Sequence, residues 1–471
     1  MTNAPETRPY RRPRPDAARL AAYDVLHAVG ERDAYANLVL PALLRERKII
    51  PRDAAFTTEL VHGTLRRQGT YDQIVAACTD RPVRDIDPPV LDVLALGVHQ
   101  LLSMRTPTHA AVSATVELAR AVLGDGRAKF VNAVLRRVSK QDLDAWLTQI
   151  APPYEDDPEG HLAVMHSHPR WIVQALWDAL GARGNAHDRA AIEALLAADN
   201  VAPAMSLVAR PGRVELAELF EAGAVPGRWS PYAATLPEGD PAGIKAIRDG
   251  RAAVQDEGSQ LVAAALADAD VTGEESRWLD LCAGPGGKAG LLAAIATGRD
   301  VRLLAVERRQ HRARLVRNAI GHLTHHQVVT ADGTKPAWLP GSFDRVIADV
   351  PCSGLGALRR RPESRWRRKA EDIPELGELQ RALLRTAIDS ARVGGVIAYV
   401  TCSPHPAETR AVVDDLLRAG DAELMDARTL FPGVPDLGTG PDVQLWPHLH
   451  GTDAMYLALL RRIEPAPARR V

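Results

Sequence analysis

A regular alternation of short apolar segments with helical patterns, beginning after Ala253, restricts this chain more than any other feature of its sequence. The apolar segments with strand character are 277–281, 301–306, 328–330, 345–348 and 396–400. Helical patterns separate or follow them, at 288–296, 310–323, 376–393 and 407–419. Such alternation is typical of parallel sheets, because each helix supplies the crossover between two parallel strands. The sequence therefore predicts a doubly wound α/β sheet with helices on both faces, a Rossmann-like fold.

The first part of the chain has a purely helical pattern. Apolar residues recur at helical spacing through 16–140, and 90–104 is a nearly continuous apolar segment suited to the centre of a bundle. Prolines fall between the periodic segments, where helices begin or end, at Pro51, Pro88 and Pro107. We therefore expect an all-α domain over 16–140. The polar, Pro- and Arg-rich residues 1–15 are expected to be a disordered tail.

The middle of the chain connects these two patterns. Residues 151–160 contain three prolines and a cluster of acids, a composition typical of a linker. From there the pattern is mixed, with expected helices at 171–180, 187–197 and 214–221 and an expected strand at 204–208. We expect a small α+β connecting domain over 160–253, followed by the α/β domain over 254–463.

Composition limits the cellular context and the partners. Hydrophobic residues make up 46% of the 471-residue chain, which is enough for a sizeable core, and the formal net charge is −1, so a nucleic-acid surface must be local. The four cysteines form no CxxC pair, so neither a zinc ribbon nor a thioredoxin-type site is indicated, and we expect no metal site. The N-terminus lacks a signal-peptide pattern, and no apolar run reaches membrane-spanning length. We expect a cytoplasmic protein that is not embedded in a membrane.

A glycine-rich turn follows the first predicted strand of the α/β domain. Its sequence, Asp280-Leu-Cys-Ala-Gly-Pro-Gly-Gly-Lys288, contains three glycines that allow a tight turn and a close approach of the backbone to a ligand. In open α/β sheets, ligands bind beyond the carboxyl ends of the strands. A glycine-rich turn alone is equally well explained as an ordinary strand–helix connection.

Acidic residues at the ends of the next two strands favour a nucleoside ligand. Glu307 ends the second strand, where a carboxylate can accept hydrogen bonds from both ribose hydroxyls. Asp332 follows the third strand and is placed to accept from an adenine amino group. Either acid alone is more often a solvated surface charge. Because the turn is not G-x-G-x-x-G, the pattern favours S-adenosylmethionine (SAM) over a nicotinamide dinucleotide.

Two further strands each deliver a cysteine at the carboxyl end, Cys352 after the fourth strand and Cys402 after the fifth. If the strands are neighbours, about 4.8 Å apart, both thiols face one crevice. A lone free cysteine is more often a small buried hydrophobe, but a pair beside a SAM-type turn suits cytosine methylation. A thiolate that adds at carbon 6 activates carbon 5 toward a methyl sulfonium, and a second group assists the later elimination. Asp349 is placed to bind N3 or the exocyclic amine of the ring.

Four motifs in order resemble those of the RNA cytosine-5 methyltransferases of the Sun/Fmu group: QDEGSQ (255–260), DLCAGPGGK (280–288), DVPCSG (349–354) and TCSPHPAE (401–408). The helical domain, which ends KFVNAVLRRV, resembles the NusB fold, and the combination is similar to bacterial 16S rRNA cytosine-5 methyltransferases. The resemblance implies Cys402 as the nucleophile and Cys352 as the residue that assists product release. It also implies a cofactor site made of Cys282, Ala283, Gly284, Pro285, Gly286, Gly287, Lys288, Glu307, Asp332 and Asp349.

A basic segment between the fourth strand and the next helix is a candidate RNA contact. Seven of the twelve residues 358–369 are basic. In a near-neutral protein such a cluster can neutralise phosphates, and an aromatic side chain within it can stack on a base. The alternative is a solvated loop with a buried tryptophan. The candidate RNA-binding residues are Arg359, Arg360, Arg361, Arg365 and Trp366.

Other functions stay open. The same chemistry on tRNA or another rRNA is the nearest alternative to 16S rRNA. A non-catalytic RNA-binding factor of ribosome assembly is a second, although the intact pair Cys352 and Cys402 argues against it. A nicotinamide-dependent oxidoreductase is a third, which the absence of G-x-G-x-x-G after the first strand disfavours. The sequence leaves the modified nucleotide and the oligomeric state undetermined.

Overall fold

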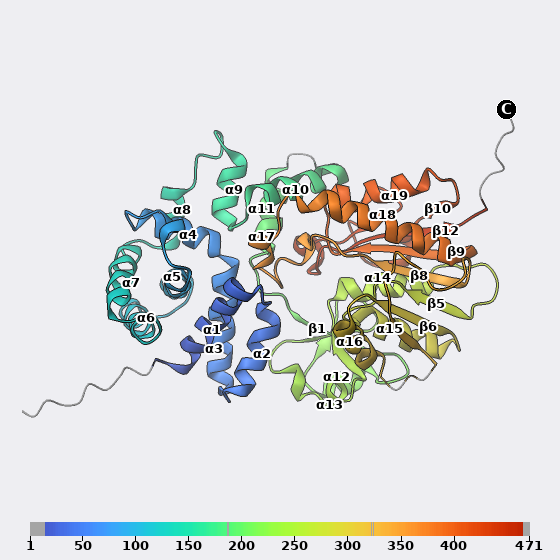
Figure 1. Ribbon diagram of the computed structural model, residues 1–471, viewed down its shortest axis with the longest axis horizontal. Helices are drawn as coiled ribbons and strands as arrows, with labels where there is room; N and C mark the ends of the chain where they lie inside the picture. The colour runs from blue at the N-terminus through green and yellow to red at the C-terminus, as the bar shows by residue number, and fades with distance from the viewer. Residues whose placement is uncertain (1–14, 186–187, 322, 324, 465–471) are drawn as a thin grey trace, which may run out of the picture. The chain divides into compact units, whose positions relative to one another are not determined.

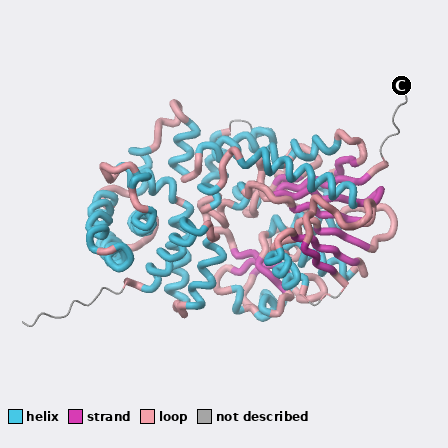
Figure 2. The backbone as a smooth tube through the Cα atoms, in the orientation of Figure 1, coloured by secondary structure: helices cyan, strands magenta, loops and turns pink. Residues whose placement is uncertain are grey.

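The computed structural model describes residues 15–185, 188–321, 323 and 325–464, and it divides the chain into two compact units (Figure 1). The helical unit contains the described residues up to Val173 together with a later segment, Arg360–Arg367. The sheet unit contains Gln174–Arg359 and the described residues from Arg368 onward. Figure 2 shows that the strands lie in the sheet unit. The predicted disordered tail, 1–15, falls almost entirely outside the described residues.

The helical unit is built around α5 (Pro88–Leu102), which contacts α1, α3, α4, α6 and α7. Val93, Leu94 and Leu96 of this helix are fully buried, so the predicted central helix is confirmed. Proline stands at the start of α3 and α5, where the missing N–H has no helical partner to lose. The other helices are α1 (Ala17–Arg32), α2 (Ala36–Glu46), α3 (Pro51–Arg66), α4 (Gln68–Ala77), α6 (Thr108–Leu123), α7 (Asp125–Val138), α8 (Leu143–Ile150), α9 (Pro158–His166) and α17 (Ser364–Arg367).

Residues 151–160 are not the plain linker that their composition suggests. Asp157 caps α9 by accepting from the Gly160 N–H, and Pro158 is the first residue of that helix. The Thr70 hydroxyl of α4 donates to the Val164 carbonyl of α9. The expected boundary near residue 160 is therefore wrong, because a capped helix starts there and packs on the helical unit. The two units divide at Val173 instead.

A small antiparallel sheet opens the sheet unit, with strand order β2-β3-β1-β4. Alternate residues of β1 face two cores: Leu207 and Ala209 pack in the small core, whereas Val208 packs in the core of the main sheet. We expected residues 160–253 to form a separate connecting domain. They do not, because strand β1 contributes residues to both cores. The elements are β1 (Met205–Ala209), β2 (Val225–Pro226), β3 (Ala233–Leu236), β4 (Ala252–Val254), α10 (Arg170–Leu180), α11 (Arg189–Ala198), α12 (Leu216–Glu221) and α13 (Lys245–Arg248).

The main sheet has the order β10-β12-β9-β8-β5-β6-β7. Neighbours from β9 to β7 pair in parallel, as predicted. Its elements are β5 (Arg277–Asp280), β6 (Arg302–Glu307), β7 (Gln327–Thr330), β8 (Phe343–Asp349), β9 (Ala391–Thr401), β10 (Ala422–Met425), β11 (Val443–Gln444), β12 (Tyr456–Arg462), α14 (Glu257–Asp268), α15 (Gly287–Gly298), α16 (Gln310–Ile320), α18 (Asp372–Ser390), α19 (Arg410–Leu417) and α20 (Pro447–His450).

One edge of the main sheet departs from the predicted all-parallel arrangement. Strand β12 lies between β9 and β10 and runs antiparallel to both. Only the four-residue helix α20 separates β11 from β12, and these two strands also pair antiparallel. A parallel return needs a crossover of a dozen or more residues, which this segment lacks. The five residues 456–460 are all buried and form a continuous apolar run, as residues of a buried parallel strand do. The hydrophobic pattern therefore did not show that β12 is antiparallel.

Helices cover both faces of the main sheet. One face packs against α14, α15 and α16, and the opposite face packs against α18 and α19. Adjacent residues of β5 divide between these layers: Trp278 belongs to the first core and Leu279 to the second. Strand β5 pairs with β6 on one side and with β8 on the other. Strands β6 and β7 are therefore added on one side of β5 and strands β8 and β9 on the other, which makes β5 the topological switch point of the sheet. The crevice beyond these strand ends is where ligands bind in such folds. No helix in the described part of the chain combines the length and hydropathy of a membrane crossing.

Candidate active site

The glycine turn, Asp280–Lys288, is held between the two strands that flank β5. The Leu281 N–H donates to the Ile347 carbonyl of β8, and the Ala283 N–H donates to the Val306 carbonyl of β6. A Cβ on Gly284 would stand 2.0 Å from Glu307 Oε2, and Gly286 has φ +116°. Glycine is therefore favoured at Gly286, where a side chain would strain the backbone, and at Gly284 a side chain would displace the Glu307 carboxylate.

The two acids predicted to face a nucleoside lie at the ends of β6 and just beyond β7. Glu307 is 5% exposed, and its Oε1 accepts from the Arg309 N–H, while its Oε2 lies 3.6 Å from Arg312 Nε. Asp332 accepts from the N–H and the hydroxyl of Thr334, and these hydrogen bonds lower its pKa. Both acids therefore stand beside the glycine-turn edge of the sheet.

The two predicted cysteines meet beyond the paired ends of β8 and β9. Asp349 of β8 pairs in register with Val400 of β9, so each strand releases its loop at the same level. The sulfur atoms of Cys352 and Cys402 are 3.3 Å apart. The hydrogen bond with Cys402, together with burial, raises the pKa of the Cys352 thiol well above its usual value. Cys352 is buried, whereas Cys402 is the more accessible of the two thiols.

A lysine and an aspartate stand beside the thiols. Lys288 Nζ, in the first turn of α15, donates to Asp349 Oδ2 at 2.8 Å. Burial favours the neutral amine, but the charge and hydrogen bond of Asp349 and the nearby Cys402 raise the pKa of Lys288. The ammonium therefore stays charged beside the Cys402 sulfur. Sequence reasoning placed Lys288 in the cofactor turn and did not foresee this contact.

A buried glutamate ties the two cysteine loops together. Glu408 is fully buried, and its Oε1 accepts from the Ser353 N–H at 2.8 Å and from Gln380 Nε2 at 3.0 Å. Its Oε2 accepts from the hydroxyls of Ser353 and Ser403. Because Ser353 follows Cys352 and Ser403 follows Cys402, one carboxylate holds both loops. The sequence contained Glu408 in the TCSPHPAE motif, but nothing in that motif indicated its partners.

The basic segment 358–369 is placed differently from our expectation. Arg359 is 5% exposed and donates to Asp453, Asp256 and the Gly451 carbonyl within the sheet unit. Arg365 is fully buried in the helical unit, where it donates to the Arg66 and Ser167 carbonyls. Burial and these internal hydrogen bonds argue against an RNA-contact role for the two residues.

The other candidates of the segment are more accessible. Arg361 is exposed and lies over the Tyr35 ring, Arg360 is half-buried, and Trp366 is 40% exposed. All three belong to the helical unit. Their role in RNA binding stays a prediction.

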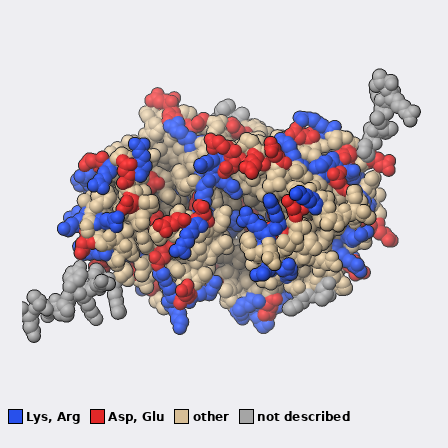
Figure 3. Space-filling view, in the orientation of Figure 1, with Lys and Arg blue, Asp and Glu red and all other residues tan. Residues whose placement is uncertain are grey.

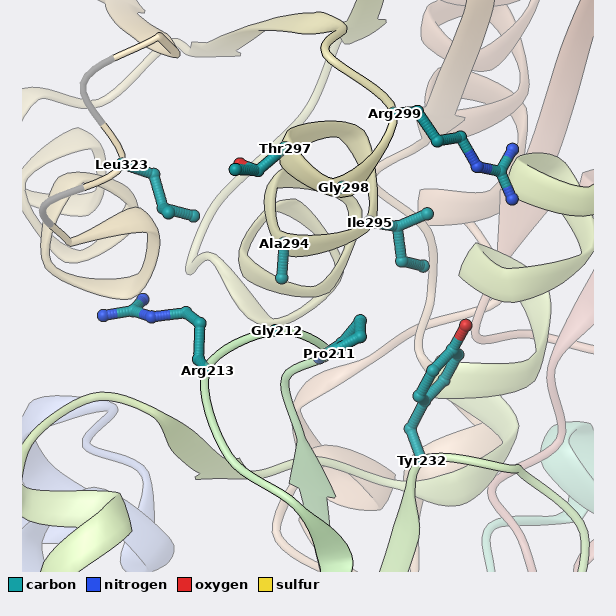
Figure 4. A pocket seen from close by; sticks show the side chains of 10 residues that line it. All are labelled: Pro211, Gly212, Arg213, Tyr232, Ala294, Ile295, Thr297, Gly298, Arg299 and Leu323. Carbon is teal, nitrogen blue, oxygen red and sulfur yellow. The ribbon is translucent and has the colours of Figure 1, made fainter.

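A cavity of about 380 Å³ in the sheet unit lies apart from this site (Figure 4). It adjoins the carboxyl-terminal half of α15, whereas the glycine turn leads into the first turn of that helix. The seven residue steps from Gly287 to Ala294 along the helix correspond to a rise of about 10 Å. The cavity is therefore not the crevice of the thiols. It is lined by Pro211, Gly212, Arg213, Tyr232, Ala294, Ile295, Thr297, Gly298, Arg299 and Leu323.

The sheet order, the glycine turn and the acids at the strand ends define a methyltransferase of the Rossmann-like class. Residues 269–461 match the family described as 16S rRNA methyltransferase RsmB/F, and residues 16–140 match the NusB family. A Mycobacterium tuberculosis protein described as a methyltransferase is 52% identical over 458 residues, 97% of this chain and 98% of its own. The chain belongs to the RsmB/F family of 16S rRNA methyltransferases, with an N-terminal NusB-family domain, which confirms both resemblances noted in the sequence.

Further relatives cover nearly the whole chain. Ribosomal RNA small subunit methyltransferase B of Pseudomonas putida is 31% identical, over 94% of this chain and 98% of its own. Among solved structures, PH0851 superposes with a TM-score of 0.77 at 19% identity, over 96% of this chain and all of its own. NSun6 from Pyrococcus horikoshii superposes with a TM-score of 0.53 at 18% identity, over 63% of this chain and 98% of its own. The structural likenesses establish the fold.

Replacing Glu408 with alanine should destabilise the protein. The substitution removes the buried acceptor shared by four donor groups and leaves the Ser353 N–H without its partner, which we expect to lower the free energy of unfolding by about 3 kcal/mol. Urea unfolding followed by tryptophan fluorescence measures the change. Glu423→Ala on β10, where the glutamate is exposed, should change stability by less than about 0.5 kcal/mol. Equal stability of the two variants would contradict the bridging role.

Asp280 should make stability depend on pH. Burial, reinforced by the charge of Asp349, raises the pKa of Asp280 to about 8. A carboxyl in an unfolded chain has a pKa of about 4, so between about pH 4 and 8 the native state binds the extra proton and stability falls as pH rises. Asp280→Asn removes this dependence. Relative to wild type, the variant should gain about 2 kcal/mol between about pH 6 and 8 in urea titrations; a constant difference would refute the shifted pKa.

Proposed function

We propose that this protein transfers a methyl group from SAM to carbon 5 of a cytosine in small-subunit ribosomal RNA. The observation that carries the proposal is the 3.3 Å approach of the Cys352 and Cys402 sulfurs at the carboxyl ends of adjacent parallel strands, beside the glycine turn. Two free thiols held together at a ligand-binding edge suit a reaction that adds and later expels a nucleophile. The membership of the RsmB/F family supports the class of substrate.

The residues of the crevice fit SAM. Glu307 presents a buried carboxylate beside Gly284, which has no side chain to displace it, and such an acid accepts from a ribose diol. Asp332, one strand further, is an acceptor suited to an adenine amine. Gln255 is 6% exposed, its Oε1 has no hydrogen-bond partner among the described residues, and its side chain adjoins Gly287. That oxygen is suited to accept from the amino group of the cofactor's methionine part.

SAM supplies an electrophilic methyl group in this site, and the side chains of the chain prepare the base that accepts it. The Cys402 thiolate adds to carbon 6 of cytosine, which makes carbon 5 nucleophilic. Lys288 stabilises the thiolate before attack through its positive charge. The Asp349 carboxylate is placed to accept from the exocyclic amine of the ring, which holds the base in position. Carbon 5 then takes the methyl group and carries both a methyl and a hydrogen.

The adduct must break down to release product. Water in the crevice, acting as the base, takes the proton at carbon 5; the electron pair re-forms the double bond between carbons 5 and 6, and the bond from carbon 6 to the Cys402 sulfur breaks, which returns the thiolate. Cys352 stands 3.3 Å from that sulfur as a protonated thiol and is placed to assist this elimination. The target base must leave its stack to reach the thiols.

One alternative function differs from the proposal in its RNA substrate, and a second differs in having no catalytic activity. The same chemistry on tRNA or another rRNA is compatible with the catalytic residues, and the family membership favours 16S rRNA over it. A non-catalytic assembly factor would have no use for a charged lysine beside two thiols in contact, one of them partly exposed. The retained geometry of Cys352, Cys402 and Lys288 therefore favours catalysis.

Cys402→Ala should abolish methylation, because no sulfur remains to add at carbon 6. Methyl transfer from radiolabelled SAM to 16S rRNA should fall at least about 1,000-fold. The matched control is Cys78→Ala, which removes a buried thiol from the helical unit and should retain the wild-type rate. Normal 5-methylcytosine formation by Cys402→Ala would sink the assignment.

Cys352→Ala should trap the adduct. The nucleophile is intact in this variant, so addition and methylation proceed while elimination slows. We expect a protein–RNA complex that survives denaturing electrophoresis, and we expect it to disappear when Cys402→Ala is combined with Cys352→Ala. If the single variant released methylated RNA as quickly as wild type, Cys352 would have no part in elimination.

A further inference from the structure

Helix α16 presents a basic surface that sequence reasoning did not single out. Arg308 and Arg309 precede the helix, and Arg314 and Arg317 lie within it. All four are exposed. In Figure 3, Lys and Arg side chains gather over the region where Figure 1 draws α16. We call these four residues the α16 basic face.

The arginines of this face form no ion pair within the described part of the chain, although Arg308 lies close enough to Asp332 for its charge to lower the pKa of that carboxyl. Their side chains make no hydrogen bond or ion pair with any residue that the structure describes. Elsewhere in the sheet unit, Arg385 pairs with two aspartates, and Arg410 and Arg418 each have a carboxylate partner. Between Glu307 and Asp332 the sequence contains no acidic residue. In a protein of net charge −1, this is a concentrated field of unpaired positive charge.

The face adjoins the candidate active site. Arg312 of α16 donates to the Gly284 carbonyl of the glycine turn. A Cβ on Gly286 would stand 2.7 Å from the Ala319 side chain and 3.0 Å from Val316 Cα, so the helix packs directly on the turn. A nucleic acid bound along α16 would therefore lie next to the crevice formed by the glycine turn and the two thiols.

We propose that the α16 basic face binds the phosphodiester backbone of the RNA substrate next to the target nucleotide. The inference rests on the proposed function. Guanidinium groups match phosphate geometry with paired donors, and four of them along one element suit a repeating anion rather than a single carboxylate. Arg359 and Arg365, which the sequence offered for this role, are already committed to internal hydrogen bonds.

The experiment removes two charges from α16 and two from another helix of the same unit. The test variant is Arg314→Gln combined with Arg317→Gln, two exposed neighbours at i and i+3, and it leaves Arg312 and its hydrogen bond to the glycine turn intact. The matched control is Arg410→Gln combined with Arg418→Gln at α19, where both arginines have acidic partners. Binding of a 16S rRNA fragment is measured over a series of potassium chloride concentrations, with methylation kinetics and SAM affinity in parallel.

We expect the slope of log affinity against log salt to shrink by about 1.5 in the test variant, because each lost phosphate contact removes about 0.7 to 0.9. KM for RNA should rise about tenfold, while kcat at saturating RNA and the affinity for SAM stay within about twofold. The control should keep the wild-type slope, because each of its arginines is paired with an acid of the protein.

Several results would overturn the proposal. An unchanged salt slope and RNA affinity would show that the face does not bind RNA. A loss of RNA affinity matched by an equal loss of SAM affinity would show that the variant disturbs the glycine turn instead. Unchanged RNA binding with lost binding of an acidic peptide would assign the face to a protein partner. If wild type binds RNA through this face but methylates no cytosine, the proposed function fails while the RNA surface stands.

Discussion

Parallel pairing of β8 with β9, in the register that sets Asp349 beside Val400, is the constraint on which the candidate site depends. Because both strands point the same way and end at the same level, each releases a cysteine loop into one crevice. A register shift of one residue would turn every side chain of a strand to the opposite face. The pairing alone brings the loops near each other, and the buried Glu408 carboxylate then holds Ser353 and Ser403 together.

The same edge of the sheet supplies opposite charges at short range. Lys288 enters from the glycine turn and Asp349 from β8, and their ion pair stands beside the two sulfurs. Burial makes each charge matter more than it would in water, because the local dielectric constant is lower. Asp280, deeper in the same region, responds to that environment with a raised pKa. The crevice therefore combines the charged Lys288 with Asp280 and Cys352, whose raised pKa values favour their protonated forms.

The segment Arg360–Arg367 shows why a run of charges is a weak guide to a binding surface. Arg365 is buried among backbone carbonyls of the helical unit, and Arg367 donates to the Val29 and Ala34 carbonyls there. Glu363 accepts from the Ala36 N–H. Long arginine side chains satisfy buried carbonyl groups as readily as they meet solvent. The unpaired arginines of α16 carry the stronger signal, since only the structure shows which charges already have partners.

Local pattern alone determined much of this protein: the helical domain, the parallel strands β5 to β9, the glycine turn and the two strand-end cysteines follow from hydrophobic period and motif spacing. Tertiary structure decided the antiparallel strand β12, the sharing of β1 between two cores, the role of Glu408 and the burial of Arg359 and Arg365. Strand direction, core membership and hydrogen-bond partners depend on contacts between residues far apart in the chain. Periodicity shows which side of a helix or strand is apolar, but it does not show which other element packs against that side.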